Sequence, residues 1–364
     1  MNSINTEFKN ESDIIMSDRI YYEIVSACNL RCIHCSDLLQ DSFEELSVKS
    51  VIKFHSEIIK HGINNSVVTG GEPTLHKDFE ELVVGLSKFG SVLITSNASV
   101  VDYELMKKIL KDNPNISLQI SMDGKNRNTF DLIRGKGTFD KVIGLINYLL
   151  ENNLNKQLGF SMTIMQQNID EVYDMICFAR DKKIGFLHFP ALLPVGLAKE
   201  KWDKIAPTSE QQIQIEELII TEMIKDDDET KISSNRIDQV LTRAMYGTKA
   251  DCLKNFTIKV TPNGNILPCP AASDSSLSLG KIDDDNIASL IIDKFIERSK
   301  EYELLTKYEL SGCKECNVKS NCNGRFCSNC GILTETKSSY GEYGCQITHR
   351  HLQNALKELN SHEI

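Results

Sequence analysis

Arg19-Ile-Tyr-Tyr-Glu-Ile-Val-Ser-Ala-Cys-Asn-Leu-Arg-Cys-Ile-His-Cys35 is the stretch of sequence that decides the fold. Its first seven residues are mostly β-branched or aromatic, which is typical of a strand. The strand leads directly into a loop that carries Cys28, Cys32 and Cys35 at Cys-x3-Cys-x2-Cys spacing. An iron–sulfur cube takes four protein ligands, so a loop with three leaves one iron open to another ligand. The stretch therefore predicts a first strand followed by an incomplete metal site.

Outward from this strand, short β-branched runs alternate with longer amphipathic runs as far as about residue 198. We expect six strands, at residues 20–25, 66–69, 92–95, 116–121, 158–164 and 186–190. We expect helices between them, at residues 48–61, 78–88, 103–111, 139–151 and 168–181. Such alternation is typical of βα units with parallel strands. It predicts an α/β fold, a partial (β/α)6 barrel of the TIM type.

Polar motifs follow the ends of consecutive expected strands. Thr69-Gly-Gly-Glu-Pro73 follows the second strand, Thr95-Ser-Asn97 the third and Ser121-Met-Asp-Gly124 the fourth. In parallel α/β architectures, ligands bind at the carboxyl ends of the strands. We therefore expect these motifs to lie together around one site.

The cysteine triplet, with Gly70-Gly-Glu-Pro73 after the next strand, resembles the signature of radical S-adenosylmethionine (SAM) enzymes. The resemblance implies that the open iron binds the amino and carboxylate groups of SAM. It also implies reductive cleavage of SAM to a 5′-deoxyadenosyl radical. Zinc is the alternative for the triplet, although zinc sites usually show two separate pairs of ligands.

The resemblance also implies contacts to SAM. Gly70-Gly-Glu-Pro73 is expected to hold the ammonium group, and Ser121 and Asp123 to contact the ribose and methionyl part. Arg134 could pair with the SAM carboxylate, or it could be a surface arginine. His34 is expected to pack near the adenine rather than bind metal. The predicted cofactor-binding residues are Gly70, Gly71, Glu72, Pro73, Ser96, Asn97, Ser121, Asp123, Arg134, Thr163 and His34, with Ser161 a weaker candidate.

Eight of the twelve cysteines lie in the last third of the chain. The patterns Cys252-x11-Gly264-x4-Cys269 and Cys313-x2-Cys316-x5-Cys322 resemble the SPASM domain, an extension of radical SAM enzymes with two auxiliary [4Fe–4S] clusters. The chain is thus expected to hold three [4Fe–4S] clusters. A zinc ribbon built from Cys313, Cys316, Cys327 and Cys330 is the alternative, but it leaves four cysteines unexplained.

The SPASM pattern assigns Cys313, Cys316, Cys322 and Cys345 to the outer auxiliary cluster. It assigns Cys252 and Cys269 to the inner cluster, with Cys327, Cys330 or both. The spacing departs from the family here, because four residues separate Cys322 from Cys327 where the family has three, and Cys330 is extra. The number of inner-cluster ligands therefore stays open.

Composition limits the domain plan and the partners. We expect a polar N-terminal tail at 1–18, a radical SAM barrel at 19–200, a helical bridge at 201–250, a SPASM domain at 251–350 and a terminal helix and tail at 351–364. The net charge of −10 argues against nucleic-acid binding. No signal peptide and no run of about 18 apolar residues is present, so a cytoplasmic protein without membrane spans is expected. Cysteines in such a protein are ligands or catalytic groups rather than disulfides.

These features favour a peptide maturase that removes a hydrogen from a ribosomally made precursor and forms a C–C or C–S crosslink. A flavodoxin or ferredoxin is the expected electron donor. The alternatives are formylglycine formation in a sulfatase and dehydrogenation of a small molecule; an iron–sulfur redox sensor is the non-enzymatic one. The sulfatase reaction is disfavoured, because Pro270 and Ala271 follow Cys269 where such enzymes carry an aspartate. We expect no separate leader-peptide-binding domain of roughly 80 residues before the first strand, because small domains have about 50 residues or more; the barrel and SPASM surfaces, or another protein, would then recognise the precursor. No catalytic base can be named from the sequence.

Overall fold

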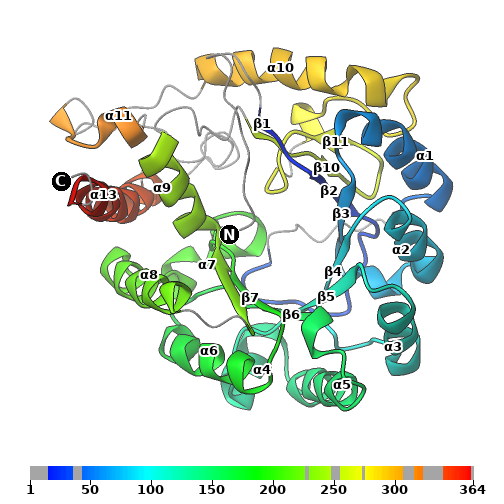
Figure 1. Ribbon diagram of the computed structural model, residues 1–364, viewed down its shortest axis with the longest axis horizontal. Helices are drawn as coiled ribbons and strands as arrows, with labels where there is room; N and C mark the ends of the chain where they lie inside the picture. Colours follow the sequence, from blue (N-terminus) through cyan, green and yellow to red (C-terminus); the bar gives the residue numbers. More distant parts are fainter. Residues whose placement is uncertain are drawn as a thin grey trace.

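The computed structural model describes residues 15–35, 43–225, 229–246, 255–272, 275–305, 315–322 and 339–361. Within these residues, a nine-stranded sheet has the order β11-β10-β2-β3-β4-β5-β6-β7-β8 (Figure 1). Neighbouring strands are parallel except β10 and β11. The edge strands β11 and β8 do not pair with each other, so the barrel is partial, as the sequence predicts.

All six expected strands are present. They are β2 (Arg19–Glu23), β3 (Asn65–Thr69), β4 (Val92–Ser96), β5 (Ile116–Ser121), β6 (Leu158–Ser161) and β7 (Phe186–Phe189). Strand β6 ends three residues earlier than expected. The reason is that the Thr163 N–H donates to Asp123 Oδ1 at 2.7 Å instead of extending the sheet.

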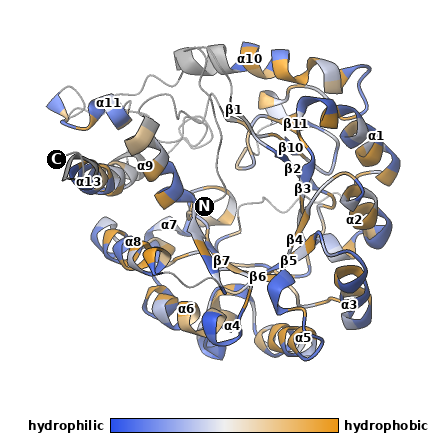
Figure 2. Ribbon diagram, viewed as in Figure 1, coloured by the Kyte–Doolittle hydropathy of each residue, from blue (hydrophilic) through white to orange (hydrophobic). Residues whose placement is uncertain are grey.

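Helices surround the outer face of the sheet (Figure 1). The expected ones are α1 (Val48–Ile58), α2 (Phe79–Ser87), α3 (Tyr103–Asp112), α5 (Phe139–Glu151) and α6 (Val172–Asp181). Helices α4 (Arg127–Arg134) and α7 (Gly196–Ile205) were not expected. Short 3-10 turns lie at Ile59–His61, Pro73–Leu75, Asn155–Gln157, Ile169–Glu171 and Ser275–Leu277. The helices carry both hydrophilic and hydrophobic residues, as expected for amphipathic helices that cover a core (Figure 2).

The segment at 201–250 contains α8 (Ser209–Ile224) and α9 (Asn235–Tyr246), but it also supplies a strand. Strand β8 (Lys231–Ser234) pairs in parallel with β7. His188 on β7 explains the pairing, because its Nδ1 lies 2.8 Å from Ser233 Oγ and its Nε2 lies 2.9 Å from Asn235 Oδ1. The sequence did not predict this strand, since it is short and only half-buried.

The cysteine-rich third also contributes to the sheet. It supplies β10 (Lys259–Val260) and β11 (Ile266–Leu267), while β9 (Asn255–Phe256) pairs with β1 (Ile15–Met16). Its helices are α10 (Ile287–Leu305), α11 (Lys319–Cys322) and α13 (Ser339–Ser361). Helix α10 was not expected, although Ile287, Ile291 and Phe295 recur at helical spacing and are buried. In the described part of the chain, no helix is both long enough and apolar enough to cross a membrane.

The two faces of the sheet differ in chemistry. Ile20 and Tyr22 on β2 belong to the core beneath the helices, and the Tyr22 hydroxyl lies 3.0 Å from His55 Nδ1 on α1. Because side chains alternate along a strand, Tyr21 and Glu23 lie on the other, inner face. The residues on this face at the carboxyl ends of the central strands are polar and half-buried, namely Glu23, Thr69, Thr95, Ser121, Ser161 and His188. The inner face is therefore polar and partly accessible.

Candidate active site

The cysteine loop is docked on the end of β3 by two glycines. The Gly71 N–H donates to the Val25 carbonyl and the Glu72 N–H to the Ala27 carbonyl, both at 2.8 Å. A Cβ atom at Gly70 would lie 2.5 Å from the Val25 oxygen, and one at Gly71 would lie 2.2 Å from the Ala27 oxygen. Only glycine permits this approach of two backbones. The Gly-Gly pair thus positions the cysteine loop.

Three further contacts hold the loop. The Asn29 Nδ2 donates to Ser99 Oγ at 2.7 Å, beyond the end of β4. The Ile33 N–H donates to the Ile133 carbonyl of α4 at 3.0 Å. The Cys35 carbonyl accepts from the Leu197 N–H of α7 at 2.9 Å. Four elements that are distant in sequence therefore fix the loop at the carboxyl end of the sheet.

The cysteine sulfurs lie among N–H donors. The Leu30 N–H is 3.5 Å and Asn97 Nδ2 3.8 Å from Cys28 Sγ, while Arg134 Nη1 is 3.9 Å from Cys32 Sγ. Burial raises the pKa of both thiols. Donors and positive charge near the sulfurs favour thiolates, and hydrogen bonds to the sulfurs are a feature of iron–sulfur sites. The loop thus fits an iron–sulfur cluster.

The described residues do not form a site for a single metal ion. Among the residues that the structure describes, no three His, Cys, Asp or Glu side chains converge as ligands of a single ion. A cube does not require such convergence, because each of its cysteines binds a different iron.

Glu72 is a fully buried carboxylate at the start of the turn that follows β3. Its Oε1 accepts from the Thr74 and Ser96 hydroxyls, both at 2.7 Å, and its Oε2 accepts from the Asn97 N–H at 2.7 Å. The Thr74 N–H is a fourth donor, at 3.2 Å. None of these donors is a cation, and burial raises the pKa of Glu72. A buried carboxylate with neutral partners fits an ammonium group as an additional ligand.

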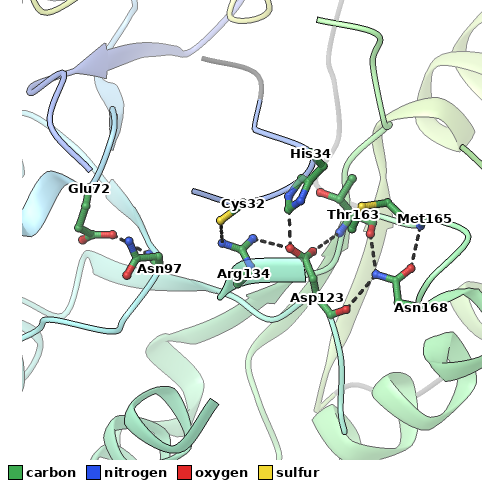
Figure 3. A network of polar contacts seen from close by, with 9 residues as sticks. All are labelled: Cys32, His34, Glu72, Asn97, Asp123, Arg134, Thr163, Met165 and Asn168. Atoms are coloured by element: carbon green, nitrogen blue, oxygen red, sulfur yellow. Dashed lines mark hydrogen bonds and ion pairs between the residues drawn. The ribbon is translucent and has the colours of Figure 1, made fainter. Parts of the chain in front are cut away.

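Asp123 forms the centre of a second network (Figure 3). Its side chain is fully buried, and its Oδ2 lies 2.6 Å from Arg134 Nη2 and 3.2 Å from His34 Nε2. Its Oδ1 accepts from the Thr163 N–H. Arg134 is 8% exposed, so the alternative that it is a surface arginine is wrong. Its guanidinium bridges Asp123 and the Cys32 sulfur.

His34 has a polar role that the sequence did not indicate. It was expected only to pack near the adenine, but its ring joins the cysteine loop to Asp123 (Figure 3). Burial lowers the pKa of His34, which favours the neutral imidazole. The ring Nδ1 is buried and has no hydrogen-bond partner among the described residues.

Two residues of the 168–171 turn were missed. Asn168 Nδ2 donates to the carbonyls of Asp123 and Thr163, each at 2.9 Å. The Glu171 carboxylate accepts the N–H groups of Lys125 and Asn126 at 2.7 and 3.0 Å, at the beginning of α4. These bonds hold the turn after β5, and no motif around either residue could have indicated them.

The other predicted cofactor contacts fall at the same end of the sheet. Pro73 is buried in the turn after Glu72, while Ser121 and Ser161 are half-buried at the ends of β5 and β6. Ser96 and Asn97 contact Glu72. The structure therefore joins some of the predicted residues into two networks: Ser96 and Asn97 around Glu72, and His34, Arg134 and Thr163 around Asp123.

The C-terminal cysteines are described only in part. Cys252, Cys313, Cys327 and Cys330 lie outside the described residues. Cys269 lies two residues beyond Leu267 of β11, which pairs with Lys259 of β10, and Lys259 pairs in turn with Tyr21 of β2. Burial raises the pKa of Tyr21, and the Cys269 thiol adds to the rise. Cys316, Cys322 and Cys345 are half-buried around α11 and α13.

Residues 22–179 match the family model described as the Radical SAM superfamily. This part of the chain is therefore a radical SAM domain.

Three curated relatives each match about half of this chain. The chain is 29% identical over 201 residues to mycofactocin maturase MftC of Mycolicibacterium smegmatis, which covers 55% of this chain and 50% of MftC. It is 34% identical over 198 residues to sporulation killing factor maturation protein SkfB of Bacillus subtilis, covering 53% of this chain and 47% of SkfB. A GTP 3′,8-cyclase of Listeria monocytogenes is 32% identical over 194 residues, covering 51% of this chain and 57% of the cyclase. The chain thus spans about half the length of the curated relatives it matches.

Solved structures share the fold over most of the chain. Streptococcus suis SuiB bound to S-adenosylmethionine superposes with a TM-score of 0.70 at 17% identity, covering 90% of this chain and 76% of SuiB. The protein anSMEcpe with bound AdoMet gives a TM-score of 0.71 at 20% identity, covering 94% of this chain and 97% of anSMEcpe. The likeness in fold therefore extends beyond the radical SAM domain.

Proposed function

We propose that this enzyme is a peptide maturase that removes a hydrogen atom from a ribosomally made precursor peptide and forms a C–C or C–S crosslink. The observation that carries the proposal is the docking of the Cys28–Cys35 loop on Gly70-Gly71 at the polar, partly accessible end of an open sheet. The maturase names of MftC and SkfB support a peptide substrate.

Cys28, Cys32 and Cys35 would hold a [4Fe–4S] cluster, and Glu72 would accept the SAM ammonium group. Bound together, the cluster and SAM supply a 5′-deoxyadenosyl radical that abstracts hydrogen. Ser121, Thr163 and the Asp123–Arg134 pair would line the remainder of the SAM site. Arg134 retains a buried Nε without a hydrogen-bond partner among the described residues. That N–H is the donor we propose for the SAM carboxylate.

The C-terminal third is proposed to be a SPASM domain with two auxiliary clusters, which makes three clusters in all. Cys313, Cys316, Cys322 and Cys345 would bind the outer one. Cys252 and Cys269, with Cys327, Cys330 or both, would bind the inner one. The position of Cys269 near Tyr21 supports an inner cluster beside the barrel. A flavodoxin or ferredoxin would supply the electrons. A reducing cytoplasm is consistent with the eight described cysteines, none of which is joined in a disulfide.

A small-molecule substrate is the second candidate, because the GTP 3′,8-cyclase of Listeria monocytogenes is about as identical to this chain as the two maturases are. Formylglycine formation remains less favoured, since the nearest aspartate after Cys269 is Asp274, which lies outside the described residues.

The first test is SAM cleavage. Purified anaerobically and reduced with dithionite, the chain should convert SAM to 5′-deoxyadenosine. The triple variant Cys28→Ala, Cys32→Ala, Cys35→Ala should lose this activity, while the control Cys177→Ala, on α6, should retain it. An active chain without the triplet would contradict the proposed cluster site.

The second test identifies the product. A precursor peptide encoded beside the gene is co-expressed with the enzyme, and its mass is then measured by mass spectrometry. Loss of two hydrogens supports a crosslink, whereas unchanged mass with deuterium uptake indicates epimerisation instead. Turnover of GTP or another small molecule, with every such peptide unmodified, would favour the second candidate.

A further inference from the structure

Glu216 is a buried carboxylate at the junction of three helices. It lies on α8 and is 1% exposed. Its Oε1 is 3.0 Å from Arg236 Nε on α9, and its Oε2 is 2.8 Å from His351 Nε2 on α13. Gln212 Nε2, one turn earlier on α8, donates to Oε1 at 2.6 Å. The carboxylate thus joins the C-terminal helix to the helices that follow β7 and β8, which lie side by side in Figure 1.

These charges have no place in the candidate active site. Taking them out of water is costly, and removing one partner leaves the others buried without compensation. Arg236 also lies over the Tyr343 ring of α13, 5.9 Å from its centre. Burial raises the pKa of Tyr343 to about 12, so this side chain stays neutral beside the charges. The ionic cluster therefore favours a single arrangement of α8, α9 and α13.

Helix α13 carries or contacts two predicted metal ligands. Cys345 lies on α13 itself, six residues before His351. His349 Nε2 is 3.1 Å from Asn317 Oδ1, and Gln353 Nε2 donates to the same oxygen at 3.3 Å. Asn317 directly follows Cys316. Displacing α13 would therefore move both Cys345 and the segment that bears Cys316.

The apolar packing around these cysteines comes from the same helices. Cys316 and Cys322 pack against a buried cluster that includes Val240 of α9 and Leu352 of α13. Leu352 is the residue after His351, so the contact of His351 with Glu216 and the contact with the cysteines occur on the same turn of α13. The three described ligands of the proposed outer cluster thus depend on the α9–α13 junction.

We propose that Glu216 is a positioning residue for the outer auxiliary cluster. It anchors α13 to α8 and α9, and so holds Cys345 and Cys316 in place for a common cluster. This inference rests on the proposed function, which assigns Cys313, Cys316, Cys322 and Cys345 to that cluster.

The test uses the full chain with Cys28, Cys32 and Cys35 replaced by alanine, so that only auxiliary clusters bind iron. After anaerobic reconstitution, this parent should bind about eight irons, as two [4Fe–4S] cubes. Adding Glu216→Gln should lower the content to about four and remove one of two electron paramagnetic resonance signals. The matched control is Glu210→Gln, an exposed carboxylate on α8 that accepts a hydrogen bond from Gln214 of the same helix and should leave both values unchanged.

A conservative variant separates positioning from folding. His351→Gln keeps an N–H donor near Glu216 and should retain more auxiliary iron than His351→Ala. With the triplet intact, Glu216→Gln should still cleave SAM and keep the parental circular dichroism. Full auxiliary iron in Glu216→Gln would overturn the proposal, and so would loss of both clusters together with helical signal. If the parent itself binds no iron, the auxiliary clusters of the proposed function fail and this inference fails with them.

Discussion

Asp123 and Glu72 are both fully buried carboxylates, but only Asp123 has a cation as partner. Arg134 lies 2.6 Å from Asp123, and the pair is complete within the chain. Glu72 accepts hydrogen bonds from neutral groups alone among the described residues, and its pKa is raised by burial. A buried negative charge without a countercharge is the residue-scale sign of a missing cationic ligand.

The variant Glu72→Gln should therefore weaken SAM binding more than it affects the fold. The amide oxygen can still accept hydrogen bonds, but the charge-assisted contact to the ammonium group is lost. We expect the dissociation constant of SAM to rise about 10-fold to 100-fold, because hydrogen bonds to charged groups contribute about 1.5–3 kcal/mol. Equilibrium binding to the anaerobic enzyme measures this. Glu104→Gln, on the exposed side of α3, is the control, and equal affinities in both variants would contradict the role of Glu72.

At the scale of elements, the site depends on how closely the cysteine loop packs on the turn after β3. Position 71 accommodates only glycine, because the Ala27 carbonyl occupies the space where a Cβ atom would lie. The two loops belong to neighbouring parallel strands, so their separation is set by the sheet. A shift of one loop must move the other.

Gly71→Ala should accordingly displace the cysteine loop. We expect the free energy of unfolding to fall by about 1–3 kcal/mol, the usual cost of overpacking. Iron bound at the triplet should fall in the same variant. Urea unfolding and iron analysis measure both effects. Gly85→Ala, in the middle of α2, is the control, because its new Cβ would meet only the flexible Ile52 side chain; a Gly71 variant as stable and as iron-rich as this control would refute the packing argument.

At the scale of the whole molecule, the buried His55 and the half-buried His188 connect strands of the sheet to neighbouring elements. His55 joins α1 to Tyr22 of β2, and His188 joins β7 to β8. Burial lowers the pKa of both side chains below their ordinary value near 6.5. Below that value, the unfolded chain binds protons that the folded chain does not.

The free energy of unfolding should therefore be greatest above about pH 6.5 and decline as the pH falls toward the folded-state pKa values. Each histidine contributes a slope of at most about 1.4 kcal/mol per pH unit. Urea unfolding at pH 7.5 and pH 5.5 measures the loss. The double variant His55→Gln, His188→Gln should show a smaller difference between the two pH values than the parent does. An unchanged difference would mean that these histidines do not link stability to pH.

The six central strands could be predicted because each is a short β-branched run between amphipathic helices. The site motifs could be predicted because parallel strands bring their carboxyl ends to one edge. Strand β8 and the contacts of Asn168 and Glu171 could not, because they depend on partners far away in the sequence. His34 illustrates the limit, since its place between two cysteines was evident but its bond to Asp123 was not.

The sequence by itself determined the fold class, the cysteine triplet and the Gly-Gly-Glu-Pro turn, because periodicity and spacing are local properties of the chain. The tertiary structure alone decided that Arg134 is buried against Asp123 and that none of the described residues places a cation beside Glu72. It also decided that Glu216 joins α13 to α8 and α9. The physical reason is that burial and charge pairing are properties of neighbours in space, and His351 reaches Glu216 from a helix more than 100 positions later in the chain.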